Sequence, residues 1–232
     1  MKPVSCARHR FPPDIIKRAV WLYLRFTLSY RDVEDLLAER GLLVSNETIR
    51  RWVLKFAPII ARNLRQSRPQ AHGRWHLDEM VISIAGRKMH LWRAVDGEGE
   101  VLELLVQSRR DQAAASRLLR KLLRRQGFMP TAIVTDKLRS YGAARRDIGL
   151  SRLHEQGPRA NNRAETSHQP LRRRERKAQG FKSAKSARRF ASAHAVVYNI
   201  FCVQRHMISR STHRQFRPAA HNSWRDATAA AA

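Results

Sequence analysis

Apolar residues recur at helical spacing over residues 14–62, which predicts a small all-helical region. Ser29 and Asp32 resemble a capping box at the start of one helix, and Gly41 fits the left-handed position that ends it. Ser45 is placed to cap the helix that follows. Two helices joined by a glycine turn predict a helix-turn-helix, with an ordinary three-helix bundle as the alternative.

The pattern changes after a polar segment at residues 63–73, which predicts a linker. Three strand-like segments follow, separated by glycine-containing turns: residues 74–84, 88–96 and 101–106. An amphipathic helix is predicted at 110–126. The continuous apolar run at 131–136 is typical of a strand buried on both faces.

Helical and strand patterns continue to residue 208. We expect a helix at about 138–147, a short strand near 151–156, a long helix from about Asn162 that Pro170 bends or interrupts, and a last helix at about 184–208. This order predicts an α/β fold, a ribonuclease-H-like mixed sheet preceded by a small all-helical domain. The expected parts are a helix-turn-helix region at 1–62, a linker at 63–73, the sheet domain at 74–208 and a basic C-terminal tail at 209–232.

Positive charge runs through every predicted segment. Lys and Arg total 46 against 19 Asp and Glu, a formal net charge of +27. This excess is larger than solubility requires, and most of it is arginine, which suits bidentate contact with phosphate. A nucleic-acid partner is therefore expected. Two cysteines, Cys6 and Cys202, argue against a disulfide framework, and the absence of a run of about 18 apolar residues argues against a membrane span.

Three acidic residues stand out against this charge. Asp78 lies inside one apolar strand, Asp136 ends another, and Glu165 lies in the first turn of a helix. Each has an ordinary explanation: a buried ion pair with an arginine, a cap for the next helix, and a favourable contact with the helix dipole. Their order favours a shared metal site, because the first and fourth strands of this fold are neighbours and the helix crosses them.

Carboxylates from separate elements suit hard divalent cations. Two Mg²⁺ ions about 4 Å apart, with Mn²⁺ able to substitute, would activate an attacking oxygen and stabilise a leaving oxygen in phosphoryl transfer. Strand alternation directs Glu79 to the sheet face opposite to Asp78, so we expect these two residues not to act together. His168 lies one turn after Glu165, where it could contact a phosphate or a metal-bound water, or be an ordinary surface histidine.

Four motifs carry a resemblance to a known family. They are Trp-His-Leu-Asp-Glu at 75–79, Arg-Ala-Val-Asp at 93–96, Thr-Asp-Lys-Leu-Arg-Ser-Tyr at 135–141, and Asn-Asn-Arg-Ala-Glu at 161–165 with His168. Together they resemble bacterial insertion-sequence transposases of the DDE class, the insertion-sequence-six family in particular. The resemblance implies that Asp78, Asp136 and Glu165 form the catalytic, metal-binding triad. Only 28 residues separate Asp136 from Glu165, fewer than is usual for the class, so Glu175 is the competing third acid.

The resemblance implies a DNA transposase that binds terminal inverted repeats and transfers DNA strands as a homo-oligomer on DNA, in a bacterial cytoplasm and at the nucleoid. Expected DNA contacts come from the second helix of the helix-turn-helix and from residues near the metal site: Asn46, Arg50, Arg51, Lys55, Lys137, Arg139, Arg163, Arg172, Arg173 and Arg174. The main alternative is a non-catalytic helix-turn-helix regulator or an inactive copy. An RNA-binding protein and a simple nuclease of the same fold are further alternatives.

Overall fold

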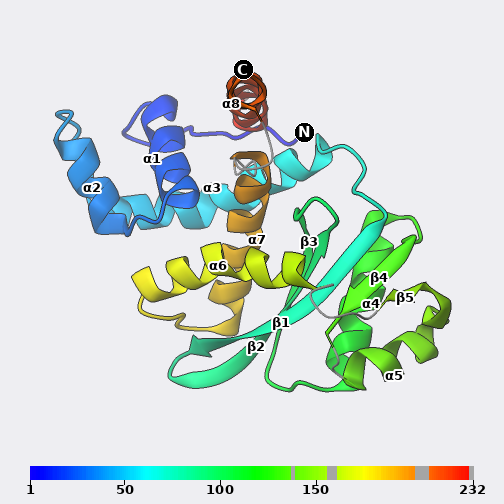
Figure 1. Cartoon of the computed structure of the whole chain (residues 1–232). Helices are drawn as coiled ribbons and strands as arrows, with labels where there is room; N and C mark the ends of the chain where they lie inside the picture. The colour runs from blue at the N-terminus through cyan, green and yellow to red at the C-terminus, as the bar shows by residue number, and fades with distance from the viewer. Residues whose placement is uncertain (137–138, 156–160, 202–208, 230–232) are drawn as a thin grey trace. The chain divides into compact units, whose positions relative to one another are not determined.

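The computed structural model describes residues 1–136, 139–155, 161–201 and 209–229. Its chain divides into two compact units, which Figure 1 shows in ribbon form. One unit joins Met1–Arg68 to Ala193–Ala232, and the other is Pro69–Ser192. Among the described helices, none combines the length and the apolar character that crossing a membrane requires.

The first unit is helical, as predicted. Its N-terminal helices are α1 (Pro13–Arg25), α2 (Tyr30–Ala38) and α3 (Asn46–Gln66). The Ser29 hydroxyl accepts from the Asp32 amide while the Asp32 carboxylate accepts from the Ser29 amide, which confirms the capping box. Gly41 has the left-handed backbone expected of it, with φ of 72°. Ser45 accepts from the Thr48 amide and caps α3, again as predicted.

The C-terminal segment differs from the predicted basic tail. Its described part forms α8 (Arg210–Ala227), in which Ala220, Trp224 and Ala227 are buried along one face. The amide nitrogen of Asn63 in α3 donates to the carbonyl of Ala227 at 2.9 Å. The described part of the predicted tail is therefore largely a helix, because these apolar residues give the arginine-rich segment a face that it buries. The linker also begins later than predicted, because α3 continues through Gln66.

The second unit is built on one five-stranded sheet. The strands are β1 (Arg74–Ile84), β2 (Arg87–Asp96), β3 (Val101–Gln107), β4 (Ala132–Thr135) and β5 (His154–Glu155), in the order β3-β2-β1-β4-β5. β1 is antiparallel to β2 and parallel to β4, and β4 is parallel to β5. This arrangement confirms the ribonuclease-H-like fold. The η1 turn (Ser151–Leu153) precedes β5.

Helices cover both faces of this sheet (Figure 1). On one face, α4 (Gln112–Gln126) and α5 (Arg139–Ile148) pack on an apolar core that includes Trp75, Leu77 and Trp92. On the other lies α6 (Asn162–Lys177), which buries Ser167, His168, Leu171 and Arg174. α6 continues through Pro170 without interruption, because buried contacts on both sides of the proline hold the helix in place.

The next helix is α7 (Ala184–Phe201), which begins where the sequence predicts and whose residues from Ala193 onward belong to the first unit. The rest of the predicted helix, residues 202–208, lies outside the described part of the chain. The sheet therefore presents one apolar face and one face on which polar side chains of β1, β2 and α6 meet. That second face positions the candidate site.

Candidate metal centre

Three carboxylates meet where β1 and β4 run side by side. Asp78 and Glu79 lie in β1, and Asp136 directly follows the last residue of β4. Each offers an oxygen that lies within 4.8 Å of the others. Because β1 and β4 are parallel neighbours, their residues Leu77 and Thr135 are paired and the acids that follow them meet at one level of the sheet. The expected proximity of Asp78 and Asp136 is confirmed.

The presence of Glu79 in this cluster corrects a prediction. Strand alternation was expected to keep its carboxylate apart from that of Asp78. However, among the described residues β4 pairs with β1 only as far as Leu77. The Glu79 amide donates to the Asp78 carboxylate at 2.9 Å. Beyond the end of the β1–β4 pairing, an oxygen of each of these two carboxylates lies within 4.8 Å of an oxygen of Asp136.

Glu79 is held by two residues that sequence reasoning missed. The Tyr141 hydroxyl, from α5, donates to the Glu79 carboxylate at 3.2 Å. Arg110 forms an ion pair with Glu79 and reaches the Asp136 carboxylate at 3.4 Å. Burial raises the pKa of Glu79, the Asp136 charge adds to this, and Arg110 opposes it without reversing it. Tyr141 lies in a motif that carried the resemblance, whereas no pattern distinguishes Arg110 from the other arginines.

Asp78 is the most perturbed acid of the cluster. Burial, followed by the charge of Glu79, raises the pKa of Asp78 to about 7, while the hydrogen bond from the Glu79 amide opposes the shift. His168 Nδ1 lies 3.6 Å from the Asp78 carboxylate. Burial, reinforced by Arg93 and Arg172, lowers the pKa of His168 to about 3, so the imidazole is neutral at neutral pH. The contact is therefore not an ion pair, and among the described residues no arginine forms the salt bridge with Asp78 that was one alternative.

The start of α6 is fixed directly over β1. The Asn161 side chain donates to the Leu77 carbonyl at 2.9 Å, and the buried Arg93 of β2 donates to the Ser167 carbonyl. Glu165 lies between these anchors and is exposed. It is not among the three acids within 4.8 Å of one another, but its charge contributes to the raised pKa of Asp78. Its place as third acid of a triad stays a prediction.

The competing acid, Glu175, is engaged elsewhere. Its carboxylate accepts from the Ser83 amide at 2.6 Å, near the end of β1. Ser83 is five residues beyond Asp78, which corresponds to about 17 Å along a strand. Glu175 therefore has a structural contact far from the carboxylate cluster. This geometry favours Glu165 over Glu175.

The expected DNA contacts of the helix-turn-helix lie at the start of α3. Arg50, Arg51 and Lys55 are exposed, and Asn46 is half-buried with its amide bonded to Glu34 at 2.6 Å. Arg50 and Arg51 both pair with Glu47 within the helix. Hydrogen bonding from Arg50 lowers the pKa of Glu47 to about 2. The helix thus carries solvent-facing cations on its first turns.

The residues of the second expected group of DNA contacts differ in their exposure to solvent. Arg172 and Arg173 are exposed on α6, and Arg163 is half-buried. Arg174 is 4% exposed and stacks its guanidinium 5.1 Å from the centre of the Phe190 ring. This burial argues against a DNA contact from Arg174, so the expected contact of this residue stays a prediction. Lys137 and the side chain of Arg139 lie outside the described part of the structure.

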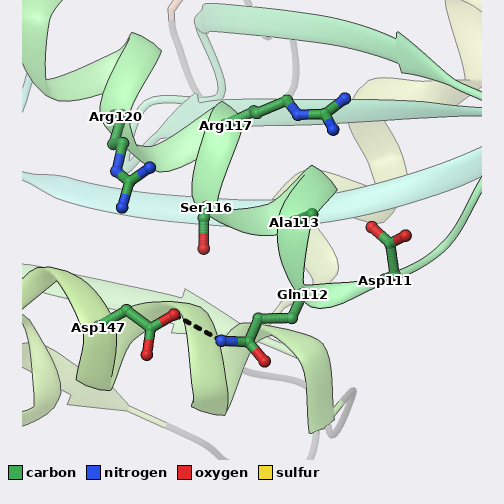
Figure 2. A pocket seen from close by; sticks show the side chains of 7 residues that line it. All are labelled: Asp111, Gln112, Ala113, Ser116, Arg117, Arg120 and Asp147. Carbon is green, nitrogen blue, oxygen red and sulfur yellow. Dashed lines mark hydrogen bonds between the residues drawn. The ribbon is translucent and has the colours of Figure 1, made fainter.

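A separate pocket of about 470 Å³ lies between α4 and α5. Figure 2 shows it lined by Asp111, Gln112, Ala113, Ser116, Arg117, Arg120 and Asp147. Gln112 donates to Asp147 across it. It contains none of the three clustered carboxylates, and its lining mixes both charges. The carboxylate cluster is the better candidate site, because it combines buried acids with a strongly raised pKa.

The carboxylate cluster fits a divalent ion by the chemistry of its donors. Mg²⁺, Mn²⁺ and Ca²⁺ prefer oxygen ligands, and one or two carboxylates with waters suffice for Mg²⁺. The raised pKa of Asp78 shows that the described surroundings do not compensate its charge fully. A cation bound between these acids would supply that compensation.

The fold is that of a ribonuclease-H-like domain, and it carries a cluster of three acids that could hold a metal ion. The chain belongs to the DDE domain family, whose model matches residues 72–204, as the sequence predicts. Members of this family use divalent metal ions.

Two relatives from Staphylococcus aureus extend this finding. The transposase for insertion sequence-like element IS431mec of strain Mu50 is 37% identical over 135 residues, or 58% of this chain and 60% of the relative. The transposase for insertion sequence element IS257 in transposon Tn4003 is 36% identical over the same shares. The matched region therefore spans about 60% of the length of these relatives. A solved structure, the catalytic core domain of BIV integrase, is 16% identical with a TM-score of 0.43, covering 66% of this chain and 99% of its own.

Proposed function

We propose that this chain is a DNA transposase that binds the terminal inverted repeats of an insertion element and catalyses metal-dependent strand cleavage and strand transfer. The observation that carries the proposal is the meeting of Asp136, at the end of β4, with Asp78 of the neighbouring strand β1, in a chain of the DDE domain family. Its net charge of +27 supports DNA as the substrate.

Asp78, Asp136 and Glu165 would hold two Mg²⁺ ions, with Mn²⁺ able to substitute. When bound, such a pair supplies activation of the attacking oxygen and stabilisation of the leaving oxygen. The protein's own part is to position these acids. Asn161 and Arg93 fix the start of α6 over β1, and this would bring Glu165 toward Asp78. The neutral His168 ring borders the Asp78 carboxylate without adding a competing positive charge.

DNA contacts would come from two surfaces. Exposed residues at the start of α3, namely Arg50, Arg51 and Lys55 with Asn46 beside them, would meet the inverted repeats. Arg163, Arg172 and Arg173 on α6 would hold DNA backbone near the metal centre. Pairing of two element ends requires a homo-oligomer on DNA. The site of action would be the bacterial cytoplasm, at the nucleoid.

The proposal is tested by cleavage and joining of a labelled duplex that ends in the element's own inverted repeat, with Mg²⁺, Mn²⁺ or EDTA. Asp78→Asn, Asp136→Asn and Glu165→Gln are each expected to abolish both reactions while DNA binding persists. Glu175→Gln is the matched control, since Glu175 contacts Ser83 outside the cluster. Activity that survives Glu165→Gln but not Glu175→Gln would move the third position to Glu175.

Glu79→Gln tests the carboxylate that the structure adds. If Glu79 supports the metal centre, this variant will lower the metal affinity and the cleavage rate without abolishing DNA binding. Salt-sensitive DNA binding by a folded wild-type protein with no cleavage under any metal would contradict the proposal. That outcome would instead indicate a non-catalytic regulator or an inactive copy.

A further inference from the structure

Arg110 reaches the carboxylate cluster from outside the sheet. It lies in the loop between the end of β3 at Gln107 and the start of α4 at Gln112. The next residue, Asp111, caps α4 by accepting from the Ala114 amide at 2.9 Å, which anchors the base of the loop. The backbone of Arg110 is therefore held near the cluster, while its side chain remains 45% exposed.

The guanidinium of Arg110 bridges two of the three clustered acids. It pairs with the nearly buried carboxylate of Glu79, to which its Nε also donates, and lies 3.4 Å from an oxygen of Asp136. A guanidinium offers several donors in a plane, so it can serve both acids at once. A divalent ion bound to Asp136 would take the carboxylate that Arg110 also contacts, would lie close to Glu79, and would repel a guanidinium beside it.

We propose that Arg110 is a displaceable cation of the metal centre, which neutralises Glu79 and Asp136 in the metal-free protein and is released by metal binding to contact a DNA phosphate. The inference rests on the proposed function, because it takes the cluster as the metal site and DNA as the substrate. Half of the Arg110 side chain already faces solvent, so its release requires no rearrangement of the core. Phosphate offers the released guanidinium a bidentate partner of the same geometry as a carboxylate.

The first test is metal affinity, measured by titration calorimetry with Mn²⁺ on the full chain in the absence of DNA. Arg110→Gln removes the competing cation and is expected to bind Mn²⁺ roughly tenfold more tightly than the wild type. Arg109→Gln is the matched control, because Arg109 is an exposed neighbour in the same loop and controls for the loss of one positive charge. Its Mn²⁺ affinity is expected to change much less.

The second test is the salt dependence of DNA binding, measured on the inverted-repeat duplex with EDTA and with Ca²⁺, which takes oxygen ligands. In EDTA, wild type and Arg110→Gln are expected to have the same slope of log affinity against log salt. With Ca²⁺, the wild-type slope is expected to be steeper than the slope of Arg110→Gln by about 0.9, the value for one added phosphate contact. Arg109→Gln is expected to give the same difference from wild type in both buffers.

Arg110→Lys guards against a folding defect, since it keeps the charge but loses the planar fork. It is expected to bind Mn²⁺ with an affinity between those of wild type and Arg110→Gln. Unchanged or weaker Mn²⁺ binding by folded Arg110→Gln would overturn the inference, as would a salt slope that does not depend on metal. Failure of the proposed function has a different signature: the wild type itself would bind no Mn²⁺, or would bind it and cleave no DNA.

Discussion

Two buried carboxylates of the same sheet have opposite electrostatics. Glu103 of β3 is 3% exposed, and both its oxygens are paired, with Lys121 at 2.9 Å and Arg125 at 2.6 Å. Asp78 of β1 is 9% exposed, and its contacts among the described residues are the Glu79 amide and the neutral ring of His168. Burial raises the pKa of Glu103, but its two cations outweigh burial and lower it overall. The pKa of Asp78 rises to about 7.

The difference teaches that burial alone does not identify a functional acid. Glu103 is compensated within the protein, so its charge contributes to holding α4 on the sheet. Asp78 is surrounded by other acids, so its charge opposes folding until a cation from outside arrives. An uncompensated buried charge is maintained by the rest of the fold, and such strained positions concentrate at functional sites.

Asp78→Asn should give the largest effect. Loss of a metal-binding carboxylate is expected to lower the strand-cleavage rate by about 10³-fold or more. The same change removes a buried, uncompensated charge, so the metal-free protein is expected to become more stable by about 1 kcal/mol. Cleavage kinetics check the expected loss of activity, and thermal unfolding in EDTA checks the expected gain in stability. A variant that is both inactive and less stable would show that Asp78 is a structural acid, as Glu103 is.

Glu103→Gln is expected to act in the opposite sense. It leaves Lys121 and Arg125 beside a neutral amide, and we expect a loss of about 2 kcal/mol in the free energy of unfolding, since both cations are partly exposed. Urea titration measures this loss. Cleavage per folded molecule should stay within about twofold of wild type, which corresponds to a ΔΔG‡ below about 0.4 kcal/mol. A large loss of cleavage at normal stability would remove the distinction between the two acids.

The pH dependence of that loss sharpens the same comparison. The pKa of Glu103 is lower in the folded than in the unfolded protein. Its contribution to stability is therefore complete above the ordinary glutamate pKa of about 4.3 and is lost as the pH falls through the lowered folded value. The stability difference between wild type and Glu103→Gln should be constant from pH 7 to about pH 5 and shrink below about pH 4. A difference that grows toward acid pH would contradict the lowered pKa.

Sequence alone could identify both buried acids as unusual, but could not separate them. Asp78 and Glu103 each interrupt an apolar strand, and the strand order already places Asp78 beside Asp136. What distinguishes the two acids is which helix presents cations to them, and that depends on the register of α4 against β3. The same limit explains Glu79, since alternation does not reveal that the pairing of β1 with β4 ends at Leu77 and Thr135, just before the three acids.

The high content of basic residues also made two structural features difficult to predict from the sequence. The segment that forms α8 contains many arginines, so its composition suggests a tail. Its apolar residues Ala220, Trp224 and Ala227 nevertheless follow helical spacing and are the signal that could have revealed the helix. On α6, five basic residues within 172–177 look equivalent in the sequence. Only the helical phase, fixed by the packing of α6 on the sheet, decides which of them face solvent.

Arg173 and Arg174 extend the comparison from acids to cations, with the smallest expected effect. Arg173 is exposed, whereas Arg174 is buried against Phe190. Arg173→Gln should weaken DNA binding roughly fivefold and reduce its salt slope by about 0.9, without changing stability. Arg174→Gln should leave the slope unchanged and lower the free energy of unfolding by about 1 kcal/mol, because it loses the contact with the ring. Filter-binding at several salt concentrations and urea titration separate the two. If both variants lost the same slope, Arg174 would have to leave Phe190 when DNA binds, and the assignment of DNA contacts on α6 by burial would fail.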